Sequence, residues 1–447
     1  MKYYRILGCL LGLALALGAQ DQTNIVITGQ VKYNLALPLF HPGAGVPANV
    51  QSTFNQVLWN DLYQSAVVHL VGRSLYTAPT PAAESDLNNP ALRSAWTAAP
   101  SSIQRLVFGA LQLNNGGLVV DGFAYDVTQP PGAGRLLARR YANPDTLDGA
   151  RSIAHHLADD IIAALGFGPG IASSQIAFIS NRSGHQEVWT MDYDGHHQQR
   201  RTRLGSIAYS PRISPDGQTV AFMSSVSGQP QIKLLSLLTN RLLSFPTFRG
   251  MAVTPAWSPD GSKLAFAANM GGANLEIFTI NANGSGLRRL TVSHGYDNLS
   301  PTWNPKPPPG SPGQIAFVSS RIGLPQIYTM NADGSNQQRV PLGGYAVSPS
   351  WSPNGLSLAF AWVRTGGGEN SGAFDIYLWY FGDQKYVQLT HNGDRNDFPS
   401  WAPDNRHIVF ESGPPYHTQL FTVAADGSVP TQLTSAGNNE MPNWSWH

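Results

Sequence analysis

The chain has little of what disulfide formation, nucleic-acid binding or membrane insertion would require. It has a single cysteine, Cys9, so no disulfide can form within it. Charged residues make up 12% of the 447 residues, about half the share usual in globular proteins. The formal net charge is +1, and removing Lys2 and Arg5 leaves 26 basic against 27 acidic residues. This balance argues against binding to nucleic acid or to an anionic membrane surface.

Catalytic motifs are also scarce. No Gly-x-Ser-x-Gly sequence occurs, which argues against a serine peptidase of the α/β-hydrolase fold. His155 and His156 each precede an aspartate by four residues, Asp159 and Asp160, which is a possible spacing for metal ligands on a helix. A solvated polar face explains these four residues without a metal. The segment 192–195 (DYDG) starts like a calcium loop but lacks its glutamate, so we interpret it as a hairpin turn. We predict no catalytic, cofactor or metal site.

The first 19 residues have the pattern of an export signal. Lys2 and Arg5 precede an apolar core over residues 6–17, and small residues follow it. This core is too short for a membrane-spanning helix. We expect cleavage after Ala19, with Ala16 and Gly18 as the alternative positions. Cys9 lies inside the apolar core, so we expect no lipoprotein cleavage site.

One short sequence recurs along the C-terminal part of the chain. Its clearest copy is residues 254–266 (TPAWSPDGSKLAF), with similar copies at 210–222, 348–360 and 398–410, and an interrupted copy that starts at Ser300. The apolar triplet inside the repeat occurs six times, at steps of 44, 44, 51, 43 and 50 residues, beginning at Ile176, Val220, Leu264, Ile315, Leu358 and Ile408. A period in the forties with strand-like segments is typical of β-propeller blades.

Each repeat predicts four antiparallel strands. Pro-x-Trp is followed by a Ser-Pro-Asp-Gly turn, and then by an apolar segment that alternates with period two. Two further strands follow, separated by Asp-Gly or Asn-Gly, which favour tight hairpin turns. Trp257, Trp303, Trp351 and Trp401 occupy the same repeat position, and we expect them to pack between blades rather than to stack on a ligand.

The two ends of the repeat region complement each other. The copy at Gln175 has no Pro-x-Trp strand before it, whereas residues 441–446 (MPNWSW) form a Pro-x-Trp strand with no apolar triplet after it. We therefore predict that the C-terminal strand becomes the inner strand of the first blade and closes the ring, which leaves no open sheet edge. The predicted fold is an all-β six-bladed β-propeller preceded by a small α/β domain.

Residues 20–168 show no repeat and predict this α/β domain. The expected elements are strands at 25–28 and 34–40, a helix opening at Asn49, a short helix capped by Asn89, a hairpin of 103–113 and 118–127, a strand at 136–142, and a last helix capped by Asp145 or Thr146 and carrying Leu147, Ile153, Leu157 and Ile161. A Gly-rich linker follows at 166–170. The predicted divisions are a signal peptide at 1–19, the α/β domain at 20–168 and the propeller at 169–447.

In a propeller, the connections from each outer strand to the next inner strand gather on one face around the channel. Here these connections are 204–209, 247–253, 293–299, 342–347, 391–397 and 435–440. They carry aromatic, Met and charged residues, of types found in protein interfaces: Tyr209, Arg249, Met251, His294, Tyr296, Asp297, Tyr345, Arg395, Asp397 and Glu440. We predict a partner-binding role for this face.

The combination of these features resembles the TolB family, the periplasmic component of the Tol-Pal system. The features are the repeated P-x-W-S-P-D-G-x-x-x-A-F, the export signal, the small α/β domain and the terminal P-N-W-S-W, so the resemblance covers essentially the whole mature chain. It implies a non-enzymatic periplasmic scaffold that maintains outer-membrane integrity and supports cell division. In such a scaffold one propeller face binds the peptidoglycan-associated lipoprotein, and the N-terminal segment binds TolA.

The resemblance assigns these roles to particular residues. The TolA-binding segment would be 20–29, with Asn24, Ile25, Val26 and Ile27 at its centre. The lipoprotein-binding face would be the connections named above, with Met251, Thr254 and Leu299 beside the matching prolines. No cofactor, nucleic acid or membrane insertion is implied, and we expect a monomer when the chain is alone. Residues 304–307 and 366–372 depart from the repeat and predict loop insertions.

Two other classes of function fit the sequence. An exported propeller enzyme acting on polysaccharide, such as a lyase or glycosidase, would need acidic residues or histidines clustered where the inner strands begin. The repeat instead places Ser or Thr there in most copies. The other class is an exported binding propeller for an unrelated partner.

Overall fold

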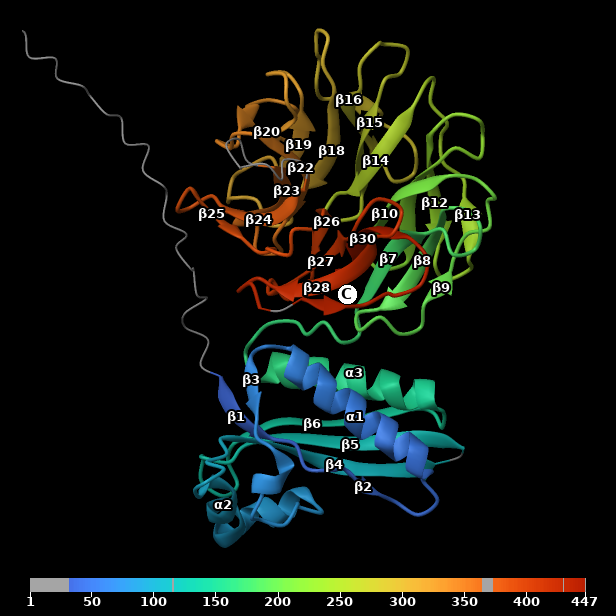
Figure 1. The fold of residues 1–447 in the computed structure, drawn as a ribbon. Coiled ribbons are helices and arrows are strands. Elements are labelled where there is room, and N and C mark those ends of the chain that lie inside the picture. Colours follow the sequence, from blue (N-terminus) through green and yellow to red (C-terminus); the bar gives the residue numbers. More distant parts are fainter. Residues whose placement is uncertain (1–31, 115, 364–372, 429, 447) are drawn as a thin grey trace, which may run out of the picture.

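The computed structural model describes residues 32–446, apart from residues 115, 364–372 and 429. The predicted signal peptide and the predicted strand at 25–28 lie outside the described residues. An α/β domain packs beneath a six-bladed β-propeller (Figure 1). The predicted fold class is therefore confirmed, whereas the exact domain boundary at 168/169 stays a prediction.

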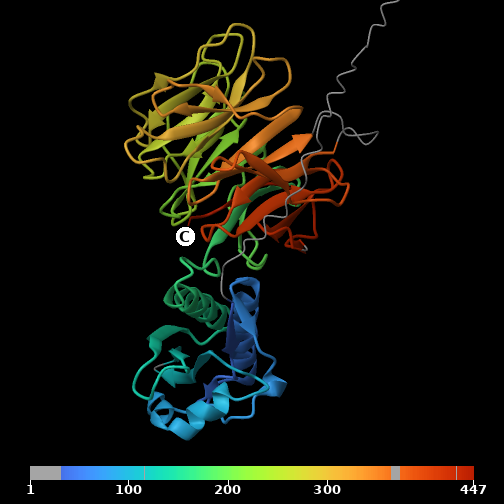
Figure 2. The same cartoon turned by 90° about the vertical axis from the view of Figure 1, so that its left-hand side faces the viewer.

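The α/β domain is built on one mixed sheet in the order β3-β1-β4-β5-β6, with β2 beside β4. Helices α1 and α3 cover the face of the sheet turned toward the propeller, and α2 lies on the other side (Figures 1 and 2). The elements are β1 (Tyr33–Ala36), β2 (His41–Pro42), α1 (Ala48–Gln64), β3 (Val68–Leu70), two short 3-10 helices (Arg73–Leu75 and Glu84–Asn88), α2 (Pro90–Thr97), β4 (Arg105–Asn114), β5 (Gly117–Asp126), β6 (Arg135–Pro144) and α3 (Leu147–Ala164).

Capping residues fix where two of these helices begin. The Asn89 side chain accepts a hydrogen bond from the backbone N–H of Ala91 (2.9 Å), as expected for an N-cap followed by proline. Of the two predicted caps of α3, Thr146 is used, and its hydroxyl accepts from the backbone N–H of Gly149 (3.0 Å). The first helix begins at Ala48, one residue before the predicted start. Of the four apolar residues predicted on α3, Ile153, Leu157 and Ile161 are buried, whereas Leu147 is exposed.

The prediction of a solvated polar face on α3 is wrong for two of its four residues. His155 is buried, and its Nδ1 lies 2.8 Å from a carboxylate oxygen of Asp61 in α1. Asp159 accepts hydrogen bonds from the backbone N–H groups of Ala172 (2.8 Å) and Ser173 (2.9 Å) in the linker. At His155 and Asp159, α3 therefore meets the propeller and the linker instead of water, whereas His156 is exposed. The sequence pattern of a polar face does not distinguish those two environments.

The propeller consists of six four-stranded antiparallel sheets. Blade 1 contains β30 (Asn439–Trp444), β7 (Gln175–Ser180), β8 (Glu187–Asp192) and β9 (Gln199–Arg200). Blades 2 and 3 contain β10 (Ala208–Ile213), β11 (Thr219–Ser224), β12 (Gln231–Ser236), β13 (Arg241–Leu243), β14 (Ala252–Trp257), β15 (Lys263–Ala268), β16 (Glu276–Asn281) and β17 (Arg288–Arg289). Blade 4 contains β18 (Asn298–Trp303), β19 (Gln314–Ser319), β20 (Gln326–Asn331) and β21 (Gln338–Arg339). Blades 5 and 6 contain β22 (Tyr345–Trp351), β23 (Ser357–Val363), β24 (Asp375–Tyr380), β25 (Lys385–Gln388), β26 (Asn396–Trp401), β27 (His407–Ser412), β28 (Gln419–Ala424) and β29 (Thr431–Gln432).

The C-terminal strand closes the ring as predicted. β30 pairs antiparallel with β7, and Trp444 lies opposite Ile176 in the register. Trp444 is fully buried, and its indole N–H donates to the Ser174 hydroxyl (2.7 Å). The two ends of the propeller are therefore joined by both backbone pairing and side-chain packing.

The recurring tryptophans pack between blades, as the sequence predicts. Trp303 belongs to a buried cluster that also holds Ile277 of the preceding blade and Phe317 of its own blade. Trp401 packs in the same way with Leu378 of the preceding blade. This repeated packing explains why one large aromatic side chain occurs at the same position of successive inner strands.

Candidate partner-binding face

The loops at the start of the inner strands form one continuous face of the propeller, which we call the loop face. It comprises the connections between blades (201–207, 244–251, 290–297, 340–344, 389–395 and 433–438) and the described hairpin loops between second and third strands (181–186, 225–230, 269–275, 320–325, 373–374 and 413–418). Near the start of every inner strand, a backbone N–H donates to a carbonyl of the preceding blade's hairpin loop. These bonds, of 2.7 to 3.1 Å, are Ala208 to Gln186, Ala252 to Pro230, Asn298 to Leu275, Ala346 to Pro325, Asn396 to Phe374 and Asn439 to Thr418. The two sets of loops are therefore locked together.

Buried or half-buried polar side chains hold each connection in place. The third strand of every blade begins with an acidic or amide residue: Glu187, Gln231, Glu276, Gln326, Asp375 and Gln419. Glu276, for example, accepts hydrogen bonds from the Thr291 hydroxyl (2.5 Å) and from the backbone N–H of Ser293 (2.5 Å). Burial by itself would raise the pKa of Glu276, but these hydrogen bonds outweigh burial and the pKa is lowered. Our sequence interpretation missed these residues, although the recurring Glu, Gln or Asp was visible.

Exposed apolar side chains concentrate on the loop face. Of the predicted residues, Met251 and Tyr345 are exposed to 37% and 38%. The structure adds others that the sequence interpretation missed, several of them on the hairpin loops: Ile207, Val226, Val292, Ile322, Leu324 and Tyr416. Scattered exposed apolar residues are ordinary, but a group on one face is typical of interaction surfaces.

The residues predicted to bind a partner differ in their solvent exposure. Arg249, Met251, His294, Tyr345 and Arg395 are exposed. Partly exposed residues are Tyr209, Thr254, Tyr296, Asp297, Leu299 and Glu440. Asp397 is buried, so it does not offer a contact surface of its own. The predicted TolA-binding residues Asn24, Ile25, Val26 and Ile27 lie outside the described part of the chain.

One cluster of predicted residues lies at the junction of blades 5 and 6. The Tyr345 ring meets Phe374 edge to face, with the ring centroids 5.1 Å apart. The Arg395 guanidinium lies 5.5 Å from the centroid of the same Phe374 ring, and it forms an ion pair with Asp397 (2.9 Å). The buried carboxylate therefore orients an exposed arginine beside two aromatic rings, an arrangement suited to binding a protein partner.

A second cluster surrounds Glu411 near the channel mouth. Glu411 accepts a hydrogen bond from the backbone N–H of Met441 (2.7 Å), and Asp397 lies opposite it in the β26-β27 register. Burial, and then the negative charges of Asp397 and Glu440, raise the pKa of Glu411 well above its ordinary value. Glu440 accepts a hydrogen bond from the Asn438 side chain (2.6 Å), and Tyr209 accepts one from Gln186 (2.8 Å).

The remaining predicted residues lie along the connections into blades 3 and 4. The Asp297 carboxylate accepts from the backbone N–H of Leu275 (2.8 Å), and Arg321 lies 5.5 Å from the centroid of the Tyr296 ring. The Thr254 hydroxyl accepts from the backbone N–H of Ser300 (3.2 Å) in the next inner strand. Leu299 packs against the buried cluster between blades.

Each inner strand has a bulge next to this face. The residue before the recurring proline of the inner strand has a φ near +50° in all six blades, namely Ser210, Thr254, Ser300, Ser348, Phe398 and Met441. The pairing register shifts at the same place in every blade. Non-glycine residues in this region of backbone conformation are strained, and bulges of this kind redirect side chains near functional surfaces.

Comparison with known proteins agrees with this architecture. Residues 165–447 match the family model described as the TolB beta propeller domain. The chain belongs to this TolB family. The resemblance drawn from the sequence is therefore confirmed.

Individual TolB relatives match part of the sequence or the whole fold. The chain is 32% identical over 209 residues to a protein TolB homolog of Chlorobium luteolum, which covers 46% of this chain and 45% of the relative. It is 37% identical over 187 residues to the Tol-Pal system protein TolB of Bordetella pertussis, which covers 42% and 41%. The matched segments thus span less than half the length of these curated relatives. The crystal structure of TolB from Acinetobacter baumannii shares the fold, with a TM-score of 0.74 at 24% identity over 92% of this chain and 96% of that one.

One observation bears on membrane contact. Within the described residues, no helix is both long enough and apolar enough to cross a bilayer.

Proposed function

We propose that this chain is a non-enzymatic scaffold of the Tol-Pal system in the periplasm. In this proposal the loop face binds the peptidoglycan-associated lipoprotein, and the N-terminal segment at 20–29 binds TolA. The complex would maintain outer-membrane integrity and support cell division. The observation that carries the proposal is the loop face itself, in a member of the TolB family, with its exposed apolar side chains and its oriented arginine at Arg395.

The side chains of the loop face, and those next to it, support a role in protein binding rather than in catalysis. Acids at the starts of the third strands, such as Glu276 and Asp375, accept hydrogen bonds from hydroxyl or backbone N–H groups, which is a structural use of a carboxylate. The Glu411 carboxyl has a raised pKa but lies beside a backbone N–H rather than beside a nucleophile. Exposed rings such as Tyr345 and Tyr416 supply rigid apolar contacts of the type that dominates protein interfaces.

Point variants on the loop face and at the opposite end of the blades test the proposed binding of the lipoprotein. Met251→Asp and Ile322→Asp each put a charge on the loop face, and both should weaken binding to a purified, anchor-free peptidoglycan-associated lipoprotein by about tenfold or more. Leu356→Asp is the matched control, because Leu356 is 64% exposed in a turn between the first and second strands of blade 5, at the opposite end of the blade. Isothermal titration calorimetry measures the affinity of the unmodified chain and of the three variants for the lipoprotein. Normal binding by both loop-face variants, or no binding by the unmodified chain, contradicts the proposal.

The TolA arm is tested separately. Deleting residues 20–29 from the exported chain should abolish recovery of TolA in a pull-down and leave recovery of the lipoprotein unchanged. Equal recovery of TolA by both chains would place the TolA site elsewhere.

A further inference from the structure

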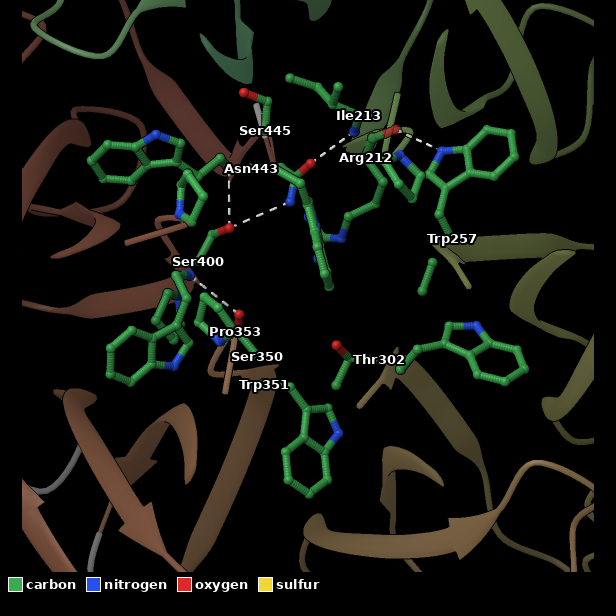
Figure 3. Close-up of a pocket in the computed structure, with 18 of the residues that line it drawn as sticks. Arg212, Ile213, Trp257, Thr302, Ser350, Trp351, Pro353, Ser400, Asn443 and Ser445 are labelled. Carbon is green, nitrogen blue, oxygen red and sulfur yellow. Dashed lines mark hydrogen bonds between the residues drawn. The ribbon is translucent and has the colours of Figure 1, made fainter. Parts of the chain in front are cut away.

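One arginine lies in the axial channel near the end opposite the loop face. Arg212 in β10 occupies the inner-strand position that holds Ala256, Thr302, Ser350, Ser400 and Asn443 in the other blades. Together with the tryptophans and the prolines of the first turns, these residues line a cavity of about 80 Å³. Figure 3 shows Arg212, Thr302, Ser350, Ser400 and Asn443 around this cavity.

The neutral residues at this position bond to the neighbouring inner strand. The Asn443 side-chain oxygen accepts from the backbone N–H of Ile213 (2.7 Å). The Ser400 hydroxyl accepts from the backbone N–H of Trp444 (3.0 Å), and the Ser350 hydroxyl accepts from that of Trp401 (3.4 Å). Both hydroxyl oxygens are used as acceptors, so each O–H is left as a donor that can turn toward the cavity.

Arg212 is the exception in this ring. Its Nη1 donates to the carbonyl of Pro211, the residue before it (3.0 Å). Across residues 32–446 with their three gaps, no carboxylate lies within ion-pair distance of the Arg212 guanidinium. A guanidinium has five N–H donors, and Arg212 lines the cavity, so donors other than the one bonded to Pro211 are available to a ligand there.

The surroundings make this cation costly. Desolvation in the channel lowers the pKa of Arg212 to about 10. The Arg212 side chain is half-buried, and an anion in contact with its partly desolvated charge adds favourable interactions. The planar guanidinium is well matched to the two oxygens of a carboxylate.

We propose that Arg212, with the hydroxyls of Ser350 and Ser400, forms a carboxylate-binding site inside the propeller channel. The cavity is large enough for one carboxylate group and too small for a sugar ring or a nucleotide. The carboxylate comes either from a small organic acid or from a peptide, as an acidic side chain or a chain end. This site is independent of the partner-binding face, because it lies near the other end of the channel.

Ligand-observed NMR on the full chain distinguishes the two sources. Saturation transfer is measured to acetate, and separately to a short peptide with a free carboxyl end and to the same peptide with an amidated end. The unmodified chain should bind acetate, or only the free-acid peptide, and Arg212→Gln should lose that binding by about tenfold or more. Arg288→Gln is the control, since Arg288 is exposed on the outer strand β17.

Each outcome decides the proposal. Binding of acetate that depends on Arg212 supports a small-acid site, and binding of the free-acid peptide alone supports a peptide site. Absence of all binding by the unmodified chain overturns the proposal, as does equal binding by Arg212→Gln. If Arg212→Gln fails to fold by near-UV circular dichroism, Arg212→Lys replaces it, and its ammonium should bind several-fold more weakly because it lacks the bidentate geometry. Affinity should also fall as the pH rises through about 10.

Discussion

Two acidic residues beside the loop face, Glu276 and Glu411, affect the stability of the fold in opposite ways. Glu276 is surrounded by hydroxyl and N–H donors, and its pKa is lowered, so its charge is stabilised by the connection it holds. Glu411 lies in β27, where the other blades have apolar or small side chains, and burial raises its pKa. The same carboxyl chemistry therefore stabilises the fold at the first position and weakens it at the second when ionised.

This difference predicts an unusual pH response for Glu411. Because its pKa is higher in the folded state than its ordinary value of 4.5, the folded state holds a proton that the unfolded state has released. The free energy of unfolding should therefore fall as the pH rises from about 4.5 through the raised pKa. Glu411→Gln keeps an acceptor for the Met441 N–H and should remove this slope, so its advantage over the unmodified chain grows with pH.

Urea unfolding at a series of pH values measures this effect. Asp383→Asn is the control, since Asp383 is exposed in the turn between β24 and β25 and does not contribute to the raised pKa of Glu411. A constant difference between Glu411→Gln and the unmodified chain from pH 4 to pH 8 would contradict the assignment.

At the scale of the elements, the closing strand decides the stability of the ring. β30 supplies the inner strand of blade 1, and Trp444 is buried within it while Trp446 is 37% exposed two residues later. Trp444→Ala should cost about 3–5 kcal/mol of the free energy of unfolding, because it creates a cavity and removes the bond to Ser174. Trp446→Ala should cost much less. Denaturant unfolding of the two variants checks this, and similar losses would show that the strand does not depend on Trp444.

Most of the propeller was predictable at this scale. The Pro-x-Trp strands, the Ser-Pro-Asp-Gly turns and the terminal strand each follow a local rule of sequence, and every one of them agrees with the structure. Their repetition made the prediction stronger, because six copies of one weak pattern point to one ring.

The parts that were missed depend on contacts between elements distant in sequence. His155 and Asp159 were predicted to face water, but α3 has a sheet on one side and the propeller on another. Asp397 was predicted as a surface contact, yet it is buried beneath Arg395. The hairpin loops with Ile322 and Tyr416 join the face only because each hairpin loop packs against the next inner strand.

At the scale of the whole molecule, a buried polar network joins the two domains. Asp61 of α1 accepts from the Tyr193 hydroxyl (2.7 Å) in the propeller and contacts His155 of α3. Arg151 of α3 forms an ion pair with Asp194 of the propeller (2.5 Å). Buried apolar residues of both domains also belong to one hydrophobic cluster, so polar and apolar contacts together hold one domain against the other.

The network predicts a pH dependence of domain docking. Burial alone would lower the pKa of His155, but its hydrogen bond to Asp61 and the charges of Asp61 and Asp194 outweigh burial, and the pKa is raised. The stabilisation is thus complete below the ordinary pKa of 6.5 and is lost as the pH rises through the raised value. His155→Asn should remove this dependence, measured by thermal unfolding.

A matched control is the neighbouring histidine. His156 is exposed, and its Nδ1 lies 2.7 Å from the Ser152 carbonyl oxygen within α3, so His156→Asn should keep the pH dependence. Equal pH profiles for the two variants would contradict the role given to His155.

The central claim is that this chain acts by binding a protein partner through the loop face. Hydrogen-deuterium exchange of the full chain, with and without the anchor-free peptidoglycan-associated lipoprotein, tests it most directly. We predict slower exchange at 244–251, 290–297 and 320–325, with no change in the turns at the opposite end of the blades, such as 352–356. Protection of those turns with an unchanged loop face, or no protection anywhere, would contradict the account.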